Sequence, residues 1–137
     1  MNEMTRIAKD TLKDINGFIG NNNYNVIRVE EGYCELEGII SETSYNNMNI
    51  VHGGYIFGLA DTAAGIAALS SVFGSDVNIV TVNASINYFK PAKGEKLIAK
   101  AKTIKPGKTI SVIEVEIYND KNDMVAKTSM TFYYITK

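Results

Sequence analysis

The sequence predicts an α+β fold in which an antiparallel sheet curls around one long central helix. The order of patterns along the chain is a short helix, two strands, a long apolar helix and four more strands. Runs of strands joined by short turns are typical of an antiparallel sheet with its helix on one face. The long helix is apolar on nearly every side, which predicts burial on more than one side. One sheet leaves part of such a helix bare, so we expect a second subunit to complete its burial.

Composition limits the classes of function that need to be considered. The 137 residues are 45% hydrophobic, which suits one domain over residues 1–137 with a core of its own. The net charge of −1 gives no basic field for nucleic acid. The N-terminus lacks the apolar core of a signal peptide, and no later run is long and apolar enough to span a bilayer. We therefore expect a cytoplasmic protein with neither a nucleic-acid nor a membrane partner.

The N-terminal third predicts one helix and a hairpin. Apolar residues at helical spacing, from Ile7 to Ile19, indicate a short amphipathic helix within residues 1–20, which the asparagines at 21–23 end. Tyr24–Val29 and Tyr33–Ile39 are expected to form two strands, joined by a turn at Glu30-Glu31-Gly32.

The rest of the chain predicts the central helix and four strands. The central helix is expected over residues 53–72, with Ser70, Ser71 and Gly74 at its end. The following β-rich segments are 79–89, 97–104, 109–118 and 124–135. In the third of them apolar residues alternate with Glu114 and Glu116, which predicts one dry and one wet face.

Cysteine and histidine each occur once, as Cys34 and His52. A single cysteine cannot form an internal disulfide, and one histidine with one cysteine does not make a zinc cluster. Cys34 falls in a strand-like run, where a buried residue is the expected role. We therefore expect no bound metal and no cofactor.

The start of the central helix is the first candidate site. Gly53 and Gly54 open the helix, whose first N–H groups have no intrahelical partner and carry the positive end of its dipole. Glycine allows a ligand to approach the main chain closely. Such an N-terminus can stabilise a carbonyl oxygen as it becomes an oxyanion, which acyl transfer requires. A Gly-Gly pair alone is weak evidence for such a site, because a simple turn into a helix also explains it.

Asp61 is the second candidate, because it is the only charged residue between His52 and Asp76. A carboxylate in such an apolar segment is costly unless it is hydrogen-bonded or faces a wet cleft. It is therefore either a structural acceptor or a nucleophile or general base. His52 shapes the oxyanion site or makes a structural bond, and Asn46 orients a carbonyl or water or simply forms the loop.

Two motifs resemble those of a known family. His52-Gly53-Gly54-x-x-Phe57-x-Leu59-Ala60-Asp61-Thr62-Ala63 resembles the signature of hotdog-fold thioesterases of the PaaI, or phenylacetate-degradation, subgroup. The strand that follows it in the same family resembles Thr81-Val82-Asn83-x-x-Ile86-Asn87-Tyr88-Phe89-x-Pro91-Ala92-x-Gly94. The similarity extends from about Gly32 to the C-terminus. It implies a single hotdog fold and hydrolysis of an acyl-CoA, including aromatic ones such as phenylacetyl-CoA.

The resemblance also implies roles for single residues. By this similarity Asp61 attacks the thioester or activates water, and the Gly53 N–H polarises the thioester carbonyl. Asn46 and His52 complete the catalytic set. The expected substrate-binding residues are Gly54, Thr81 near the leaving thiolate, and Lys90, Lys93 and Lys108 near the CoA phosphates, although solvated surface lysines explain these three as well. From residue type alone, Tyr88 either lines an acyl pocket or belongs to the ordinary core. We expect a homodimer as the minimal unit, assembled into a homotetramer.

Two other functions remain open on the same fold. Dehydratases and hydratases of acyl thioesters pair a histidine with an acidic residue on the central helix, but their loop carries His-Phe-Pro-Gly, whereas Gly-Gly follows His52 here. A non-catalytic acyl-CoA-binding module would not need Asp61.

Overall fold

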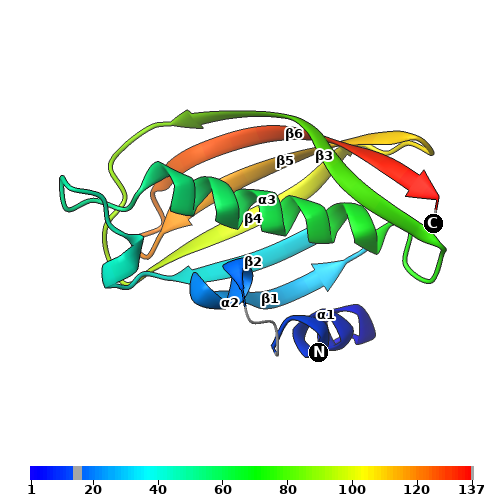
Figure 1. The fold of residues 1–137 in the computed structure, drawn as a ribbon, viewed down its shortest axis with the longest axis horizontal. Helices are drawn as coiled ribbons and strands as arrows, with labels where there is room; N and C mark the ends of the chain where they lie inside the picture. Colours follow the sequence, from blue (N-terminus) through cyan, green and yellow to red (C-terminus); the bar gives the residue numbers. More distant parts are fainter. Residues whose placement is uncertain (14–16, 137) are drawn as a thin grey trace.

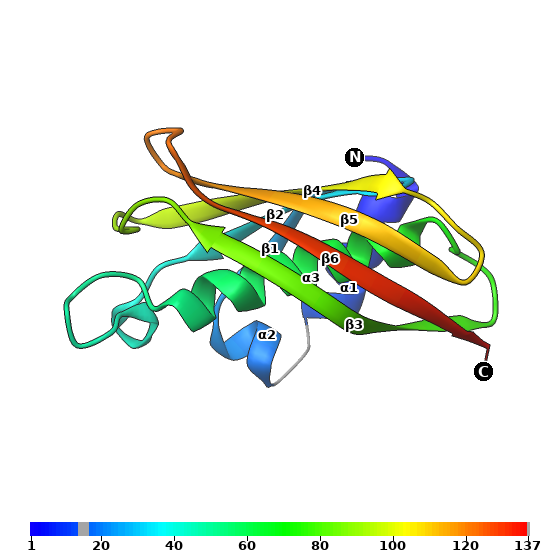
Figure 2. The ribbon, with the colours of Figure 1, turned by 90° about the horizontal axis from the view of Figure 1, so that it is seen from above.

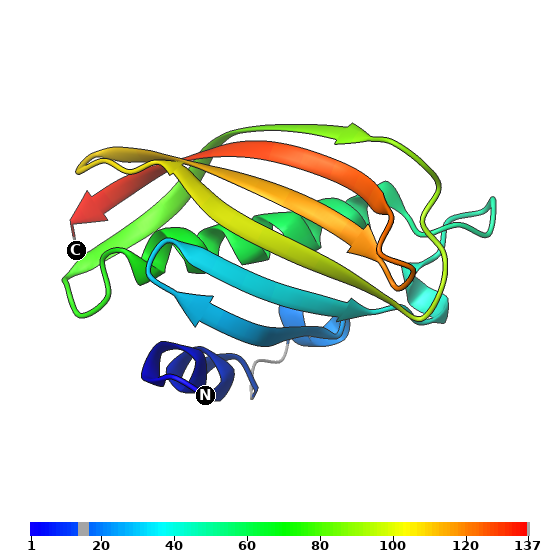
Figure 3. The ribbon, with the colours of Figure 1, turned by 180° about the vertical axis from the view of Figure 1, so that it is seen from behind.

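The computed structural model describes residues 1–13 and 17–136, which form one curled sheet around a central helix (Figure 1). The helices are α1 (Glu3–Lys13), α2 (Phe18–Asn21) and α3 (Gly53–Ser70), with a 3-10 turn at Glu42–Ser44. The strands are β1 (Tyr24–Glu30), β2 (Tyr33–Ile39), β3 (Val77–Tyr88), β4 (Lys96–Lys105), β5 (Ile110–Asn119) and β6 (Met124–Thr136). All adjacent strands pair antiparallel, in the order β1-β2-β4-β5-β6-β3, which is visible from the outer face in Figure 3. The predicted α+β class is confirmed.

The strands follow the predicted alternation. In β5 the side chains of Ile113, Val115 and Ile117 are fully buried, while Glu114 and Glu116 between them remain partly exposed. The apolar side chains face α3 because it fills the concave side of the sheet. The thiol of Cys34 on β2 is also buried in this core, and burial raises its pKa to about 12. A thiol with so high a pKa is a packing residue, as predicted.

Helix α3 is not covered on every side, as predicted for a helix wrapped by one sheet. Ten of its 18 residues are buried against the sheet. The other eight form a stripe along the helix, here called the open stripe: Gly53, Gly54, Phe57, Asp61, Thr62, Gly65, Ile66 and Leu69. Figure 1 looks onto this side of α3, with β3 along one flank and β1, α1 and α2 along the other. Asp61 therefore lies at the open stripe and not in the core.

The N-terminal helix differs from the prediction. A single helix through residues 14–16 was predicted, but these residues lie outside the described part of the chain. Beyond them, Gly17 has a φ of 146°, which no α-helix accommodates, so α2 is a separate short turn. The ring of Phe18 then packs directly over Gly58 of α3, where a Cβ would come within 2.7 Å of the ring. The two segments together flank α3 on its β1 side.

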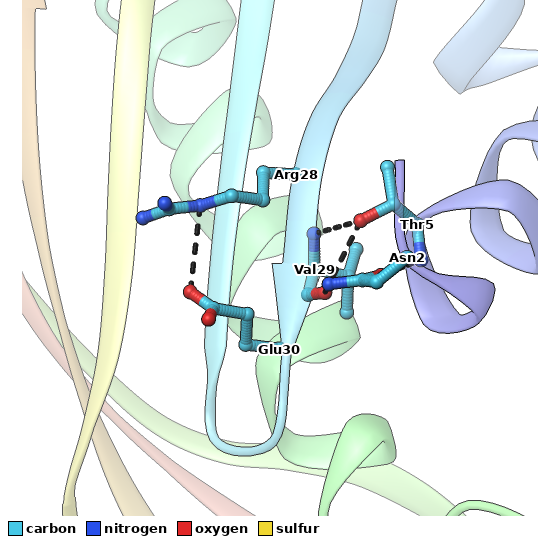
Figure 4. A network of polar contacts seen from close by, with 5 residues as sticks. All are labelled: Asn2, Thr5, Arg28, Val29 and Glu30. Carbon is cyan, nitrogen blue, oxygen red and sulfur yellow. Dashed lines mark hydrogen bonds and ion pairs between the residues drawn. The ribbon is translucent and has the colours of Figure 1, made fainter.

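The two edge strands of the sheet, β1 and β3, differ in whether their outer backbone groups have hydrogen-bond partners. At the β1 edge, Val29 donates its N–H to Thr5 Oγ1 at 2.8 Å and accepts from Asn2 Nδ2 at 3.0 Å (Figure 4). Asn2 and Thr5 at the start of α1 thereby occupy the backbone groups of Val29 at that edge. At the other edge, β3 pairs only with β6 within the described residues (Figure 2). An uncovered strand of 12 residues is a ready template for pairing with another chain.

Candidate functional site

His52 determines how α3 begins. Its backbone is extended, with φ −61° and ψ 135°, and its Nδ1 accepts a hydrogen bond from the Gly54 N–H at 2.8 Å. A ring nitrogen that accepts carries no proton, so any imidazole proton of neutral His52 is on Nε2. The bond caps one of the free N–H groups of the helix start. The sequence left two roles open for His52, and the structure shows a structural hydrogen bond. The donor of this bond is the Gly54 N–H, and the acceptor is His52 Nδ1.

Gly53 is the first residue of α3, and its two backbone groups face different partners. Its carbonyl accepts a hydrogen bond from Tyr88 Oη at 2.8 Å. No acceptor pairs with its N–H among the residues that the structure describes. A Cβ at this position would lie 3.2 Å from the Tyr88 ring, so glycine accommodates the close approach of the tyrosine. The site thus presents one unoccupied N–H at the positive end of a helix dipole.

Asn46 lies in the same pocket as Gly53. Its Oδ1 accepts from the N–H groups of Met48 at 2.9 Å and Ile50 at 3.3 Å, which shapes the loop before α3. Its side-chain NH₂ makes no bond within the described residues, so it can still donate to a ligand. The pocket has a volume of about 350 Å³. Its lining includes Asn46, Gly53, Tyr88, Phe89 and Lys90.

Asp61 and Thr81 meet at a second point on the open stripe. Asp61 Oδ1 accepts a hydrogen bond from Thr81 Oγ1 at 2.9 Å, which ties the carboxylate to β3. The side chain is partly exposed, so its ionised form keeps contact with water. Its other oxygen accepts no bond in the described part of the chain. This arrangement leaves one carboxylate oxygen available for a water molecule or an acyl carbon.

The two clusters lie apart along one helix. Gly53 and Asp61 are eight residues apart, which is roughly 12 Å at a rise of ~1.5 Å per residue. Groups that act on one acyl carbon must approach their reacting atoms to within ~3–3.5 Å. A single chain therefore holds two separate polar clusters, one with Asn46, Gly53 and Tyr88, the other with Asp61 and Thr81.

The lysines divide between the two ends of the molecule. Lys90 lies at the Gly53 pocket, where its Nζ is 3.2 Å from Asp123 Oδ2. The hydrogen bond from Lys90 lowers the pKa of the Asp123 carboxyl, and both groups are half exposed. Lys108 instead lines a groove with Ser71 and Val72, at the far end of α3. That end is ~27 Å from Gly53 along the helix, so one chain does not bring Lys108 to the pocket.

Two contacts at the site were not predicted from the sequence. The Tyr88 hydroxyl donates to the carbonyl of Gly53, which is 35 residues away in the sequence. The Lys90 ammonium donates to the carboxylate of Asp123, which is 33 residues away. Neither pair has a local sequence signal. A signal for the His52 cap did exist, because a polar residue directly before a Gly-Gly helix start occupies the position where caps are found.

No metal site accompanies these groups. Within residues 1–13 and 17–136, no cluster of three histidine, cysteine, aspartate or glutamate side chains could bind a metal ion. None of the helices described is long and apolar enough to cross a membrane. The groups available for chemistry are thus a carboxylate, a backbone N–H, an amide and hydroxyls.

Comparison with solved structures confirms the hotdog fold. The Escherichia coli PaaI protein of the phenylacetic acid degradation operon superposes with a TM-score of 0.86, at 22% identity, over 96% of this chain and 94% of that one. A Streptococcus mutans protein bound to acetyl-CoA superposes with a TM-score of 0.80, at 29% identity, over 92% of this chain and 97% of that one.

Sequence comparison identifies the family. An Archaeoglobus fulgidus protein described as an esterase is 32% identical over 113 residues, which are 82% of this chain and 71% of that protein. The Escherichia coli medium/long-chain acyl-CoA thioesterase YigI is 25% identical over 96 residues, 61% of this chain and 62% of that enzyme. The pattern of the thioesterase superfamily matches residues 48–126, from the loop before α3 into β6. The chain therefore belongs to the thioesterase superfamily and is a thioester hydrolase.

Proposed function

We propose that the protein hydrolyses acyl-CoA to a free acid and CoA in sites shared between two chains. The observation that carries the proposal is the open stripe of α3, which presents an unoccupied Gly53 N–H and the partly exposed Asp61 carboxylate on one face. Both groups suit acyl transfer, yet they are ~12 Å apart within one chain. Two antiparallel copies of α3 would bring Gly53 of one chain beside Asp61 of the other, in two equivalent sites.

The free edge of the sheet supports this assembly. Asn2 and Thr5 occupy the backbone groups of Val29 at the β1 edge, whereas β3 has no partner on its outer side among the described residues. Val80 and Val82 of β3 are 43% and 57% exposed, so apolar side chains lie uncovered at this edge of the sheet. Pairing of β3 with its copy would extend the sheet and place the two open stripes together. The homodimer is the minimal unit of this proposal, and two dimers would form the homotetramer.

Known relatives support acyl-CoA as the substrate. YigI is a medium/long-chain acyl-CoA thioesterase, and the Streptococcus mutans protein was solved with acetyl-CoA. In this chain the pocket beside Gly53 would take the thioester, and the Asn46 NH₂ would orient a water or the carbonyl. Lys90 and Lys108 would meet the CoA phosphates, with Lys108 on the same chain as Asp61.

The chemistry follows from the groups available. As a general base, Asp61 takes a proton from water while the water oxygen attacks the thioester carbon. The Gly53 N–H, at the positive end of α3, stabilises the oxyanion that forms. The C–S bond then breaks, the thiolate leaves as CoA after it accepts the proton, and the acid is released. As a nucleophile, Asp61 would attack the thioester carbon directly, and the C–S bond would break with loss of the CoA thiolate, which takes a proton from water. Water would then hydrolyse the mixed anhydride to the free acid and the Asp61 carboxylate. Thr81, which donates to Asp61 Oδ1, orients the carboxylate in either route.

A panel of acyl-CoA substrates tests the proposal. The purified protein should release free CoA from at least one medium-chain or arylacyl-CoA without added metal or nucleotide, as thiol release would show. A chelator should leave the rate unchanged, because the described residues offer no cluster of metal ligands. Hydration or dehydration of the acyl group without thiol release would favour the dehydratase function. Tight binding of acyl-CoA with no turnover would favour the binding module.

A further inference from the structure

Of the backbone N–H groups at the start of α3, that of Gly53 alone lacks an acceptor in the described part of the chain. The His52 N–H donates to the Ser44 carbonyl at 2.7 Å, and the Gly54 N–H donates to His52 Nδ1 at 2.8 Å. The N–H groups of the next two residues donate to the His52 carbonyl. The Gly53 N–H is therefore the one left for a ligand, and its direction depends on how firmly Gly53 is held.

The sequence at this point provides little stiffness of its own. Gly53 and Gly54 have no side chains to restrict their backbone, and glycine loses more conformational freedom on folding than any other residue. The ends of helices also fray. A group that acts in catalysis must nevertheless be held within about 0.5 Å of its productive place by supporting hydrogen bonds. The Gly53 N–H therefore needs a partner from outside α3 that fixes its residue.

Tyr88, the last residue of β3, is that partner. Its Oη donates to the Gly53 carbonyl at 2.8 Å, and its ring lies close to the Gly53 backbone, since an added Cβ would be 3.2 Å away. Burial raises the pKa of Tyr88, so the hydroxyl keeps its proton at neutral pH and acts as the donor. No second side chain donates to the Gly53 carbonyl within residues 1–13 and 17–136.

The tyrosine lies on a segment that is itself well anchored. Tyr88 pairs with Ala126 of β6, and the N–H of the next residue donates to the Val125 carbonyl at 2.8 Å. Further along, the Ala92 carbonyl accepts from the Val51 N–H at 2.9 Å. The end of β3 is thus joined to the sheet on one side and to the segment that leads into α3 on the other.

We infer that Tyr88 is a positioning residue of the hydrolytic reaction, whose hydroxyl holds Gly53 so that its free N–H points at the thioester oxygen. The inference rests on the proposed function, since it needs the Gly53 N–H to stabilise the oxyanion. Thr81 holds the Asp61 carboxylate from the same strand. In the proposed dimer Gly53 and Asp61 of one chain belong to different sites, so β3 of each chain supports both active sites.

Tyr88→Phe tests the inference, because it removes the hydroxyl and keeps the ring. Tyr88 is 48% exposed, so the variant should fold, as urea denaturation would show. We expect kcat to fall roughly 3–10-fold, the effect of one lost neutral hydrogen bond, with KM unchanged. The factor should be the same for two acyl-CoA substrates of different chain length, because the hydroxyl acts on Gly53 and not on the acyl group.

Tyr133→Phe is the matched control. It removes the hydroxyl of a tyrosine with a similar exposed fraction, 42%. Tyr133 lies on β6, seven residues or ~23 Å beyond Ala126, the residue that pairs with Tyr88. Its loss should leave kcat and KM at the wild-type values.

Two double variants separate a role at Gly53 from a role elsewhere. Gly53→Pro removes the N–H, so addition of Tyr88→Phe to it should lower kcat no further. Gly53→Ala places a Cβ against the same ring but keeps the N–H. Addition of Tyr88→Phe to the alanine variant should therefore lower kcat by the full factor.

Three results would overturn the inference and leave the proposed function intact. They are the full factor in the proline background, a wild-type kcat in Tyr88→Phe, and a change confined to KM, which would make Tyr88 a contact of the substrate. A wild-type kcat in Gly53→Pro, or no release of CoA by the wild type, would instead contradict the proposed function itself.

Discussion

Asp61→Asn is expected to lower kcat for the best acyl-CoA substrate by on the order of 100-fold or more. The amide keeps the size of the carboxylate and can still accept from Thr81, but it neither takes a proton from water nor attacks a thioester. Unfolding by urea should change little, because Asp61 lies on the open stripe and makes one side-chain hydrogen bond among the described residues. Steady-state kinetics and urea denaturation together measure both effects.

Thr81→Val is the companion variant. It removes the hydroxyl that donates to Asp61 Oδ1 at 2.9 Å but leaves the carboxylate charge in place. We expect a fall in kcat that is much smaller than that of Asp61→Asn, with KM nearly constant, because Thr81 only positions the acting group. Turnover close to wild type in Asp61→Asn would show that Asp61 serves the structure alone.

Gly53→Pro is expected to lower kcat by ~10²–10³-fold, the loss typical for one oxyanion-stabilising donor. Proline removes the backbone N–H and is well tolerated at the first position of a helix. The preceding residue, His52, already has the extended conformation that proline requires, with φ −61° and ψ 135°. The helix should therefore start as before, and kcat measured for the folded variant reports the lost N–H.

Gly53→Ala is the matched control for this change. Its added Cβ meets Tyr88 at 3.2 Å, as a proline Cβ would, but the N–H remains. Tyr88 is 48% exposed and can shift by the few tenths of an ångström required. The alanine variant should keep most of the wild-type kcat. Equal losses in the alanine and proline variants would assign the effect to crowding of Tyr88 and remove the N–H from the mechanism.

The fold could be predicted from the sequence because its signals are local. Alternation in β5 and the Gly-Gly start of α3 gave the strands and the helix to within about two residues. The N-terminal helix was extended too far, because apolar spacing from Ile7 to Ile19 obscured the break at Gly17. The sheet order could not be read from local patterns, since β3 pairs with the last strand of the chain.

The candidate site was less predictable, because its geometry depends on contacts between distant segments. Residue type alone identified Gly53, Gly54 and Asp61 as candidate site residues. Whether Asp61 lies in the core or on the open stripe depends on which sides of α3 the curled sheet covers. Likewise, the hydrogen bond from Tyr88 to the Gly53 carbonyl depends on where the end of β3 lies beside the start of α3.

The central claim is that each active site combines Gly53 of one chain with Asp61 of the other. Mixing Asp61→Ala with Gly53→Pro, after joint unfolding and refolding, tests it most directly. In a random mixture half of the dimers contain one chain of each kind. Each of these would hold one intact site and one doubly altered site, so activity should recover to about a quarter of wild type. If both residues acted within one chain, every site would keep a defect. No recovery, with subunit exchange confirmed by differently tagged chains, would contradict the shared site.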